Sequence, residues 1–290
     1  MDQNAWLARR VIAYAHQGGA REAPSSTLAA IGRAADLGAT AIELDVHSTA
    51  DGHLVVCHDP TLERTTDGSG PIASHTLAEI KALDNAYWFV PGEDAQPGRN
   101  PAAYPLRGRA RDDEGYRVAT LAEVLERFPG LVLNLDIKQT APAVEPYEQA
   151  LADLLRAYDR CDDVIVASFA DEATTRFSAY APEIPTSAGK AATAGFFRAV
   201  VSGGDVPEAA RRHVALQVPV TYGDVTLVDE RFVTRAHSAG LAVHVWTVDE
   251  RGEMEGLLDL GVDGIISDRP SILVEVLEER GMTWKQGAAH

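Results

Sequence analysis

The sequence predicts an α/β fold, namely a (β/α)8 TIM barrel that carries an inserted segment after its second strand. Short apolar strands alternate with amphipathic helices along most of the 290 residues, and this alternation is typical of parallel strands joined by helical crossovers. The order helix, glycine, strand recurs at Gly38, Gly240 and Gly261. A count of about eight strands and roughly seven or eight helices at this length fits a closed barrel.

A doubly wound open sheet is the alternative architecture. It lacks support because the dinucleotide-binding fingerprint is missing: Gly18 and Gly19 have no third glycine at the required offset. We therefore expect a single barrel domain over residues 1–290, with the insertion at about 60–118.

Each element follows from its local pattern. The hydroxyls of Ser25, Ser26 and Thr27 can cap a helix that starts at Leu28 and stops at Gly38. The expected strands are 11–16, two strands within 40–59, 131–138, 164–169, 184–188, 215–220, 241–247 and 264–267. The further expected helices are 77–83, 121–128, 144–158, 172–180, 191–201, 229–238, 250–260 and 270–280. Residues 87–117 show little periodicity and are rich in Pro, Gly, Arg and Asp, as expected of an insertion. Its charged part, 107–117, is expected to face solvent.

Composition limits the possible partners. The formal net charge of −17 argues against nucleic acid, which is bound through basic patches. The two cysteines, Cys57 and Cys161, form neither a disulfide framework nor a zinc-finger spacing. No stretch approaches the roughly eighteen apolar residues of a membrane helix, and the first sixteen residues lack a signal-peptide core. We expect a cytoplasmic protein without an integral membrane segment, and nothing here indicates its oligomeric state.

The central stretch, residues 40–59, has the pattern of a strand, a turn at Asp51-Gly52 and a second strand that ends in His58. Side chains alternate along a strand, so Glu43, Asp45 and His47 share one face. The two carboxylates then lie about 7 Å apart along that face. Like charges at this distance are unfavourable unless a cation lies between them or one is protonated. The alternatives are therefore a metal site and a solvated acidic face.

In a barrel, functional groups gather at the carboxyl ends of the strands. The strand ends of this sequence supply three carboxylates and several other polar or aromatic side chains: His16, Glu43, Asp45, His58, Asp136, Lys138, His244 and Trp246. Oxygen ligands from Glu43, Asp45 and Asp136 suit Mg²⁺ or Ca²⁺. A hard dication beside a lysine can hold phosphate oxygens, and two histidines can serve as general acid and base. The predicted reaction is metal-assisted phosphodiester cleavage.

Five segments together resemble the glycerophosphodiester phosphodiesterase family: AHQGG, ELDVHSTADGHLVVCHDPTLERTT, LNLDIK, HVWTVD and GVDGIISDRP. The resemblance implies a (β/α)8 barrel that hydrolyses glycerophosphodiesters to an alcohol and glycerol 3-phosphate with a divalent cation, Mg²⁺ or Ca²⁺, with Mn²⁺ also considered. It implies that His16 and His58 are the catalytic pair, that Glu43 and Asp45 bind the metal, and that Lys138 contacts phosphate or substrate oxygens.

The sequence departs from the family pattern at three places. The usual H-R-G has Gln17 in place of the arginine, which removes a bidentate phosphate binder. The usual E-I-K has Asp136, one methylene shorter, in place of the glutamate. The usual P-E-N-T is P-S-S-T, with Ser25 and Ser26. We expect altered substrate or metal preference from Gln17 and Asp136, and Gln17, Lys138 and Trp246 as substrate-binding residues.

Two other functions are considered. The first is lysophospholipase D or phospholipase C-like activity on lipid phosphodiesters, for which the apolar stretch at Tyr87–Val90 in the insertion is the only candidate for a membrane-facing rim. The second is a binding protein of the same fold with weakened catalysis, which Gln17 and Asp136 suggest. His47 is expected to support its neighbours, and Cys57 is excluded as a nucleophile because adjacent strand residues point apart.

Overall fold

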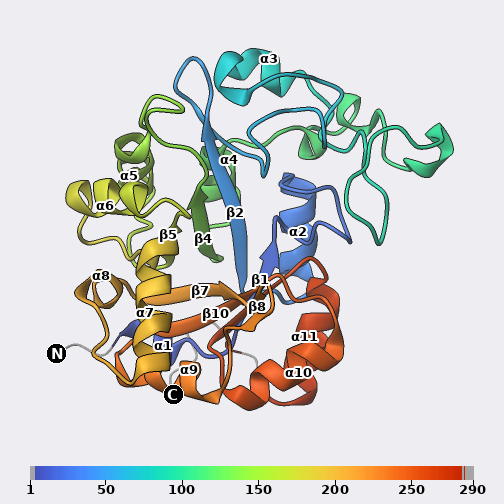
Figure 1. Ribbon diagram of the computed structural model, residues 1–290. Coiled ribbons are helices and arrows are strands. Elements are labelled where there is room, and N and C mark those ends of the chain that lie inside the picture. Colours follow the sequence, from blue (N-terminus) through green and yellow to red (C-terminus); the bar gives the residue numbers. More distant parts are fainter. Residues whose placement is uncertain (1–3, 283, 285–290) are drawn as a thin grey trace.

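The computed structural model describes residues 4–282 and Trp284, and its main sheet closes almost completely into a parallel barrel (Figure 1). The barrel strands, in sequence order, are β1 (Ile12–His16), β2 (Ala41–Ser48), β4 (Val132–Ile137), β5 (Val164–Ala167), β6 (Ser187–Ala188), β7 (Ala215–Pro219), β10 (Ala242–Trp246) and β11 (Gly264–Ser267). The strand order is β5-β4-β2-β1-β11-β10-β7-β6. A parallel bridge between Val166 and Thr186 links the two ends of this order. The predicted (β/α)8 barrel is confirmed.

Helices surround the strands because the outward-facing strand residues are apolar. The main helices are α2 (Leu28–Asp36), α4 (Leu121–Arg127), α5 (Glu148–Ala157), α6 (Asp171–Tyr180), α7 (Lys190–Ser202), α9 (Glu230–Ser238), α10 (Arg251–Leu260) and α11 (Pro270–Glu279). Leu44 of β2 and Leu133 of β4, for example, belong to the same buried cluster as Ile31 of α2 and Val124 of α4. The opposite face of each strand is thereby free to carry polar groups at its carboxyl end.

A layer of apolar side chains fills the barrel interior at the amino ends of the strands. It includes Ile12, Tyr14, Val132 and Ile165. The short helix α1 (Ala5–Ala8) adds Trp6, which is 2% exposed and belongs to this layer. The sequence pattern did not predict α1. Because apolar side chains fill this end of the barrel, the polar groups at the carboxyl ends of the strands are accessible from the opposite end.

The central stretch forms the predicted hairpin. β2 pairs in antiparallel fashion with β3 (Leu54–Val56), and the turn places Gly52 at a φ of 81°. Glycine adopts this left-handed conformation without steric cost. The chain then leaves the barrel and returns beside β3, where the Val56 N–H donates to the Ala119 carbonyl. These two points bracket the predicted insertion.

The insertion contains short elements only and covers the α2 side of the barrel in Figure 1. They are η1 (Ile72–Ser74), α3 (Leu77–Lys81), η2 (Pro101–Ala103), η3 (Arg109–Arg111) and η4 (Glu114–Tyr116). Arg107 was expected in a solvated run, and this is wrong for its guanidinium, which lies 4.3, 4.6 and 4.2 Å from the ring centroids of Tyr87, Trp88 and Tyr104. Arginine stacks on aromatic faces through its planar charge, so these residues form the interior of the insertion.

Proline explains two shifted boundaries. The helix expected at 144–158 begins at Glu148, just after Pro146, because proline interrupts the hydrogen bonds of a helix interior. The strand expected at 184–188 is reduced to β6, since Pro185 has no N–H to give to the ladder. The sequence pattern also missed α8 (Glu208–Arg211) and a hairpin of β8 (Thr221–Tyr222) and β9 (Val225–Thr226). Among the described residues, no helix is long and apolar enough to cross a membrane.

Candidate active site

Strand register brings the predicted site residues together. His16 of β1 pairs with Glu43 of β2, and Asp45 of β2 pairs with Asp136 of β4. These are adjacent parallel strands, so their carboxyl ends meet at one end of the barrel. His58 follows β3 and lines the same cavity as His16, Glu43 and Asp45. The sequence therefore placed these residues correctly, whereas their roles stay predictions.

His16 lies among carboxylates. Its Nδ1 is 2.7 Å from Oδ1 of Asp268, and its Nε2 is 3.6 Å from Oε2 of Glu43. Burial lowers the pKa of His16, but the Glu43 and Asp268 carboxylates outweigh burial and raise it to about 9. The Asp268 contact fixes the plane of the imidazole, as a carboxylate partner does for a catalytic histidine.

His58 has a similar partner in a more exposed position. Its Nδ1 is 2.7 Å from Oδ1 of Asp59, and its side chain is 38% exposed. Asp59 also accepts hydrogen bonds from Arg64 Nε at 2.7 Å and from another guanidinium nitrogen of Arg64 at 3.1 Å. Burial raises the pKa of Asp59, but hydrogen bonds from His58 and Arg64 outweigh it, so the pKa is lowered. Asp59 is thus held as an anion beside His58.

The floor of the site is a buried group of carboxylates with one lysine. Lys138 Nζ lies 2.8 Å from Oδ1 of Asp45 and 3.3 Å from Oδ2 of Asp136. Burial raises the pKa of Glu43 and of Asp136 well above the ordinary range of carboxylic acids. Burial opposes the charge of Lys138, but Asp45 and Asp136 outweigh this effect and raise its pKa. One ammonium thus balances a cluster of three carboxylic acids only in part.

The same cluster was predicted to bind the metal. Among residues 4–282 and 284, no group of three or more His, Cys, Asp or Glu side chains has the spacing to hold an ion as it stands. However, the donor set fits a hard cation: Glu43 Oε2, Asp45 Oδ2 and Asp136 Oδ1 are buried and lack hydrogen-bond partners. Unpartnered buried carboxylate oxygens are costly, and oxygen ligands are those that Mg²⁺ and Ca²⁺ prefer.

Gln17 lines the cavity beside His16 and His58, and both ends of its side-chain amide have neighbours. It is 3% exposed, and its backbone is left-handed, with a φ of 53°. Its Oε1 accepts a hydrogen bond from Ser25 Oγ at 2.5 Å, and its Nε2 lies 3.1 Å from Nε2 of His16. Two departures from the family pattern, Gln17 and Ser25, are therefore in direct contact. Arg21, which could have compensated for Gln17, is engaged with Asp94 and Asp249 at 3.3 Å each.

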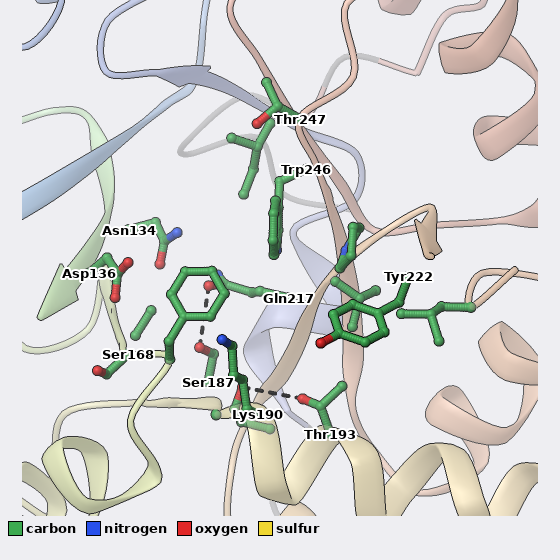
Figure 2. A pocket seen from close by; sticks show the side chains of 18 of the residues that line it. Asn134, Asp136, Ser168, Ser187, Lys190, Thr193, Gln217, Tyr222, Trp246 and Thr247 are labelled. Carbon is green, nitrogen blue, oxygen red and sulfur yellow. Dashed lines mark hydrogen bonds between the residues drawn. The ribbon is translucent and has the colours of Figure 1, made fainter. Parts of the chain in front are cut away.

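The histidines border two cavities. A cavity of about 590 Å³ extends from His16, Glu43 and Asp45 along the mouth of the barrel past Trp246. Figure 2 shows its part around Asp136, Gln217 and Trp246. A second cavity of about 330 Å³ also touches His16 and His58, and the rest of its lining comes from the β1–α2 loop, the insertion and Asp268. Trp246 thus lines a cavity next to the acidic cluster, and its ring packs edge-on against Phe169 with centroids 5.6 Å apart.

Two further histidines differ in position. His47 Nε2 lies 3.4 Å from the backbone oxygen of His58, consistent with a supporting place. His244 was expected at the mouth, and this is wrong: it is fully buried one layer deeper, with its ring 5.2 Å from that of Tyr14. Burial lowers the pKa of His244 to about 3. Strand alternation correctly places the His244 side chain on the same face as that of Trp246. It does not show how far from the mouth of the barrel His244 lies.

Sequence reasoning missed Asp268 and Arg64. Asp268 follows β11 directly, and its N–H donates to Asp249 Oδ1 at 2.8 Å. A carboxylate just after the last strand of a predicted barrel lies at the functional end, and this signal could have found it. Arg64 lies in the insertion, where no periodicity indicates which side chains turn toward the barrel. It bonds Asp59 and also lines the second cavity beside His16 and His58.

Comparisons with known proteins agree with this geometry. Residues 16–272 match the model of the glycerophosphoryl diester phosphodiesterase family. The glycerophosphodiester phosphodiesterase of Caldanaerobacter subterraneus is 31% identical over 274 residues, which cover 94% of this chain and 100% of that protein. A crystal structure of a glycerophosphodiester phosphodiesterase from Agrobacterium tumefaciens shares the fold with a TM-score of 0.70 at 24% identity, covering 91% of this chain and 99% of that one. A phosphodiesterase from Oleispira antarctica, solved in complex with the product sn-glycerol-3-phosphate, has a TM-score of 0.71 at 25% identity, with 94% and 99% covered.

Proposed function

The chain belongs to the glycerophosphoryl diester phosphodiesterase family and is a phosphoric diester hydrolase; on that premise we propose how its residues act. The proposed reaction is hydrolysis of a small glycerophosphodiester to an alcohol and glycerol 3-phosphate, with a divalent cation and two histidines. The observation that carries the proposal is the pairing of His16 and His58, each with a carboxylate on Nδ1, above a buried acidic cluster.

The histidines would move the protons. The attacking oxygen belongs either to water or to the neighbouring glycerol hydroxyl, and one histidine accepts its proton as the new bond to phosphorus forms. The other histidine donates a proton to the leaving alkoxide as the bond from phosphorus to the alcohol breaks. If the glycerol hydroxyl attacks, a cyclic phosphate forms first, and water then opens it to glycerol 3-phosphate. Asp268 and Asp59 hold the two rings in place, which general acid–base catalysis requires because proton transfer depends on hydrogen-bond geometry.

A bound Mg²⁺, Ca²⁺ or Mn²⁺ would supply positive charge for a non-bridging phosphate oxygen. Glu43, Asp45 and Asp136 would hold the ion, since each has a buried carboxylate oxygen without a hydrogen-bond partner at this place. Lys138, 18% exposed at its side chain, would offer its remaining hydrogen-bond capacity to the phosphate. Gln17, which the sequence predicts to bind substrate, would instead act by contacting His16.

The test is an assay of chelator-stripped protein for release of glycerol 3-phosphate from glycerophosphocholine and glycerophosphoethanolamine. Mg²⁺, Ca²⁺ or Mn²⁺ is added back separately, and thermal unfolding is followed in parallel. We expect release only with a cation. We also expect the same cation to raise the melting temperature of the parent, because a ligand that binds only the folded state stabilises it. Asp45→Asn should abolish both effects. Equal release with and without cation would refute the metal proposal, and no release with any cation would refute the substrate.

The single domain over residues 1–290 and the cytoplasmic location stay predictions from the sequence. The ends of that range lie outside the described residues. The binding-protein alternative has less support, because the site keeps both histidines with their carboxylate partners.

A further inference from the structure

We propose that the larger cavity contains a binding site for a second phosphate group, formed by Lys190, Arg198 and Gln217. The substrates that it fits best are then glycerophosphodiesters that carry a phosphate besides the one that is hydrolysed. This inference rests on the proposed function, since the same histidines and the same acidic cluster act on the diester. The bonds made and broken are those of the proposed hydrolysis, and the second phosphate is bound but not attacked.

The charged side chains around this cavity fall into two groups. Those from the barrel strands and from His58 belong to the reaction centre described above. The remaining charged residues of the lining are Lys190 and Arg198, both on α7, and no Asp or Glu accompanies them among the described residues of this wall. The chain has 43 acidic and 26 basic residues, so a wall whose only charges are positive runs against its overall balance. Such a wall attracts anions.

Neither cation is paired with a carboxylate in the part of the chain that the structure describes. Both residues are exposed, whereas Arg21 and Lys138 near the same site each contact two carboxylates. Asp171 Oδ2 and Oδ1 accept the N–H groups of residues 191 and 192 at 2.7 and 3.0 Å. These N–H groups at the start of α7 are therefore occupied, and the attraction for an anion comes from the side chains.

The face of α7 that lines the cavity runs from one cation to the other. It consists of Lys190, Thr193, Ala194, Phe197 and Arg198, the spacing of residues that share one side of a helix. At a rise of 1.5 Å per residue, the backbones of the two cations lie roughly 12 Å apart along the helix axis. A phosphate placed between them is within reach of both side chains, because each is long and flexible.

Lys190 also lies close to the reaction centre. Its Nζ is 5.0 Å from the ring centroid of Phe169, and Nζ of Lys138 is 5.8 Å from the same centroid. Lys138 is the residue proposed to contact the phosphate that is hydrolysed. Because both ammonium groups lie this close to one ring, a glycerol unit with a phosphate at each end can contact both.

A buried amide supplies a further hydrogen-bond donor. Nε2 of Gln217 is buried and has no partner among the described residues, whereas Oε1 of Gln217 accepts a hydrogen bond from Ser187 Oγ at 3.2 Å. The Ser187 contact leaves the NH2 end of the amide for a ligand, and a buried donor without a partner is costly. Figure 2 shows Ser187, Lys190 and Gln217 bordering the same pocket. Ammonium, guanidinium and amide NH2 groups are all donors, which suits a phosphate because its oxygens accept.

The test is a competition between glycerophosphoglycerol and glycerophosphoglycerol that carries a terminal phosphate, mixed in one sample with one divalent cation. Phosphorus NMR follows the loss of each diester, and the relative rates give the ratio of the two kcat/KM values independently of enzyme concentration. We expect the parent to prefer the phosphorylated diester by about 5–10-fold at low ionic strength, because exposed ion pairs contribute modestly and two act here. The preference should shrink toward one at about 0.5 M NaCl, where exposed charges are screened.

In the double variant Lys190→Gln/Arg198→Gln the preference should fall to near one even at low ionic strength. The matched control is Arg127→Gln/Arg211→Gln, which removes the same charge from exposed residues of α4 and α8 that do not line the cavity. Its preference should equal that of the parent. Thermal unfolding of both double variants checks that they fold.

A parent enzyme that hydrolyses both diesters with equal kcat/KM would overturn the second phosphate site and leave the proposed function standing. Hydrolysis of neither diester would overturn both. A preference that persists in Lys190→Gln/Arg198→Gln, or that falls equally in the control variant, would overturn the assignment to this wall.

Discussion

The imidazole rings of His16 and His58 lie with their centroids 6.2 Å apart and their planes at 84° to each other. One ring comes from the end of β1 and the other from the loop after β3. Each is oriented by a carboxylate at 2.7 Å from Nδ1. In the proposed mechanism, a phosphate group between or beside the two Nε2 atoms would be within reach of both histidines.

Replacement of either histidine by alanine should greatly slow turnover. We expect His16→Ala and His58→Ala each to lower kcat by roughly 10²–10⁴-fold, the usual contribution of a general acid or base. The double variant should be little slower than the slower single variant, because residues that act as a unit are not additive. Urea unfolding checks that the fold survives, as expected for side chains that are 18% and 38% exposed. A single variant with the parent rate would contradict the assignment.

Asp268 should act through His16. In Asp268→Asn the amide can present its N–H to Nδ1 of His16 and so favour the wrong tautomer, while the backbone bond from the Asp268 N–H to Asp249 remains. We expect kcat to fall by about 10²–10⁴-fold, as when the aspartate of a catalytic triad becomes asparagine. KM should change little, because Asp268 is placed behind the imidazole. A rise in KM at constant kcat would instead indicate that Asp268 contacts the substrate.

Much of this site follows from strand alternation and strand order. Glu43, Asp45 and Asp136 could be placed together because every second residue of a strand shares a face and parallel strands end at one side of a barrel. The same alternation predicts that Leu44 and Leu133 face the opposite side of their strands and are buried there. These inferences depend only on residues that are neighbours in sequence or in adjacent strands.

Contacts between loops could not be predicted in this way. Ser25 meets Gln17 across a tight loop, Arg64 reaches Asp59 from the insertion, and Tyr222 borders the cavity from an unpredicted hairpin. None of these follows a period of 2 or 3.6 residues, because the positions depend on turns and on packing against the barrel. The membrane-facing rim expected at Tyr87–Val90 is wrong for the same reason: Phe89 and Val90 are 5% and 7% exposed, and the rings of Tyr87 and Trp88 pack on Arg107.

The ionised form of Asp59 should contribute to stability in a pH-dependent way. The pKa of Asp59 is lowered in the folded protein, so its stabilisation is present above the unfolded value, near pH 4, and is lost as pH falls toward the folded value. We expect Asp59→Asn to lower the free energy of unfolding at pH 7 by about 1.5–3 kcal/mol, the range for hydrogen bonds to a charged group. The difference between parent and variant should narrow below about pH 4.

Urea unfolding of both proteins at a series of pH values between neutral and acidic provides the measurement. Asp67→Asn is a control, since Asp67 also lies in the insertion but bonds the Asp84 N–H and does not touch His58. A difference for Asp59→Asn that is constant with pH would show that the carboxylate charge is not the source of the stabilisation.

Gln17 and Ser25 should be energetically coupled. The family pattern has arginine and glutamate at these two positions, and here a neutral pair in contact replaces them. Gln17→Arg alone would place a guanidinium at a site that is 3% exposed, beside a serine that cannot balance its charge. We expect this variant to lose about 2–4 kcal/mol of unfolding free energy, because an unpaired buried charge is strongly destabilising. The left-handed backbone at position 17 disfavours glutamine and arginine alike, so its cost cancels when the variant is compared with the parent.

Adding Ser25→Glu should recover part of that loss, because the new carboxylate can pair with the guanidinium. We expect a coupling energy of about 1–3 kcal/mol from a double-mutant cycle of Gln17→Arg and Ser25→Glu, within the range for residues in direct contact. Urea unfolding of the parent, both single variants and the double variant measures it. Thr27→Ser, which keeps the capping hydroxyl of α2, is a control for general sensitivity of this loop. If the losses of unfolding free energy in the two single variants simply add up in the double variant, the two positions are not coupled.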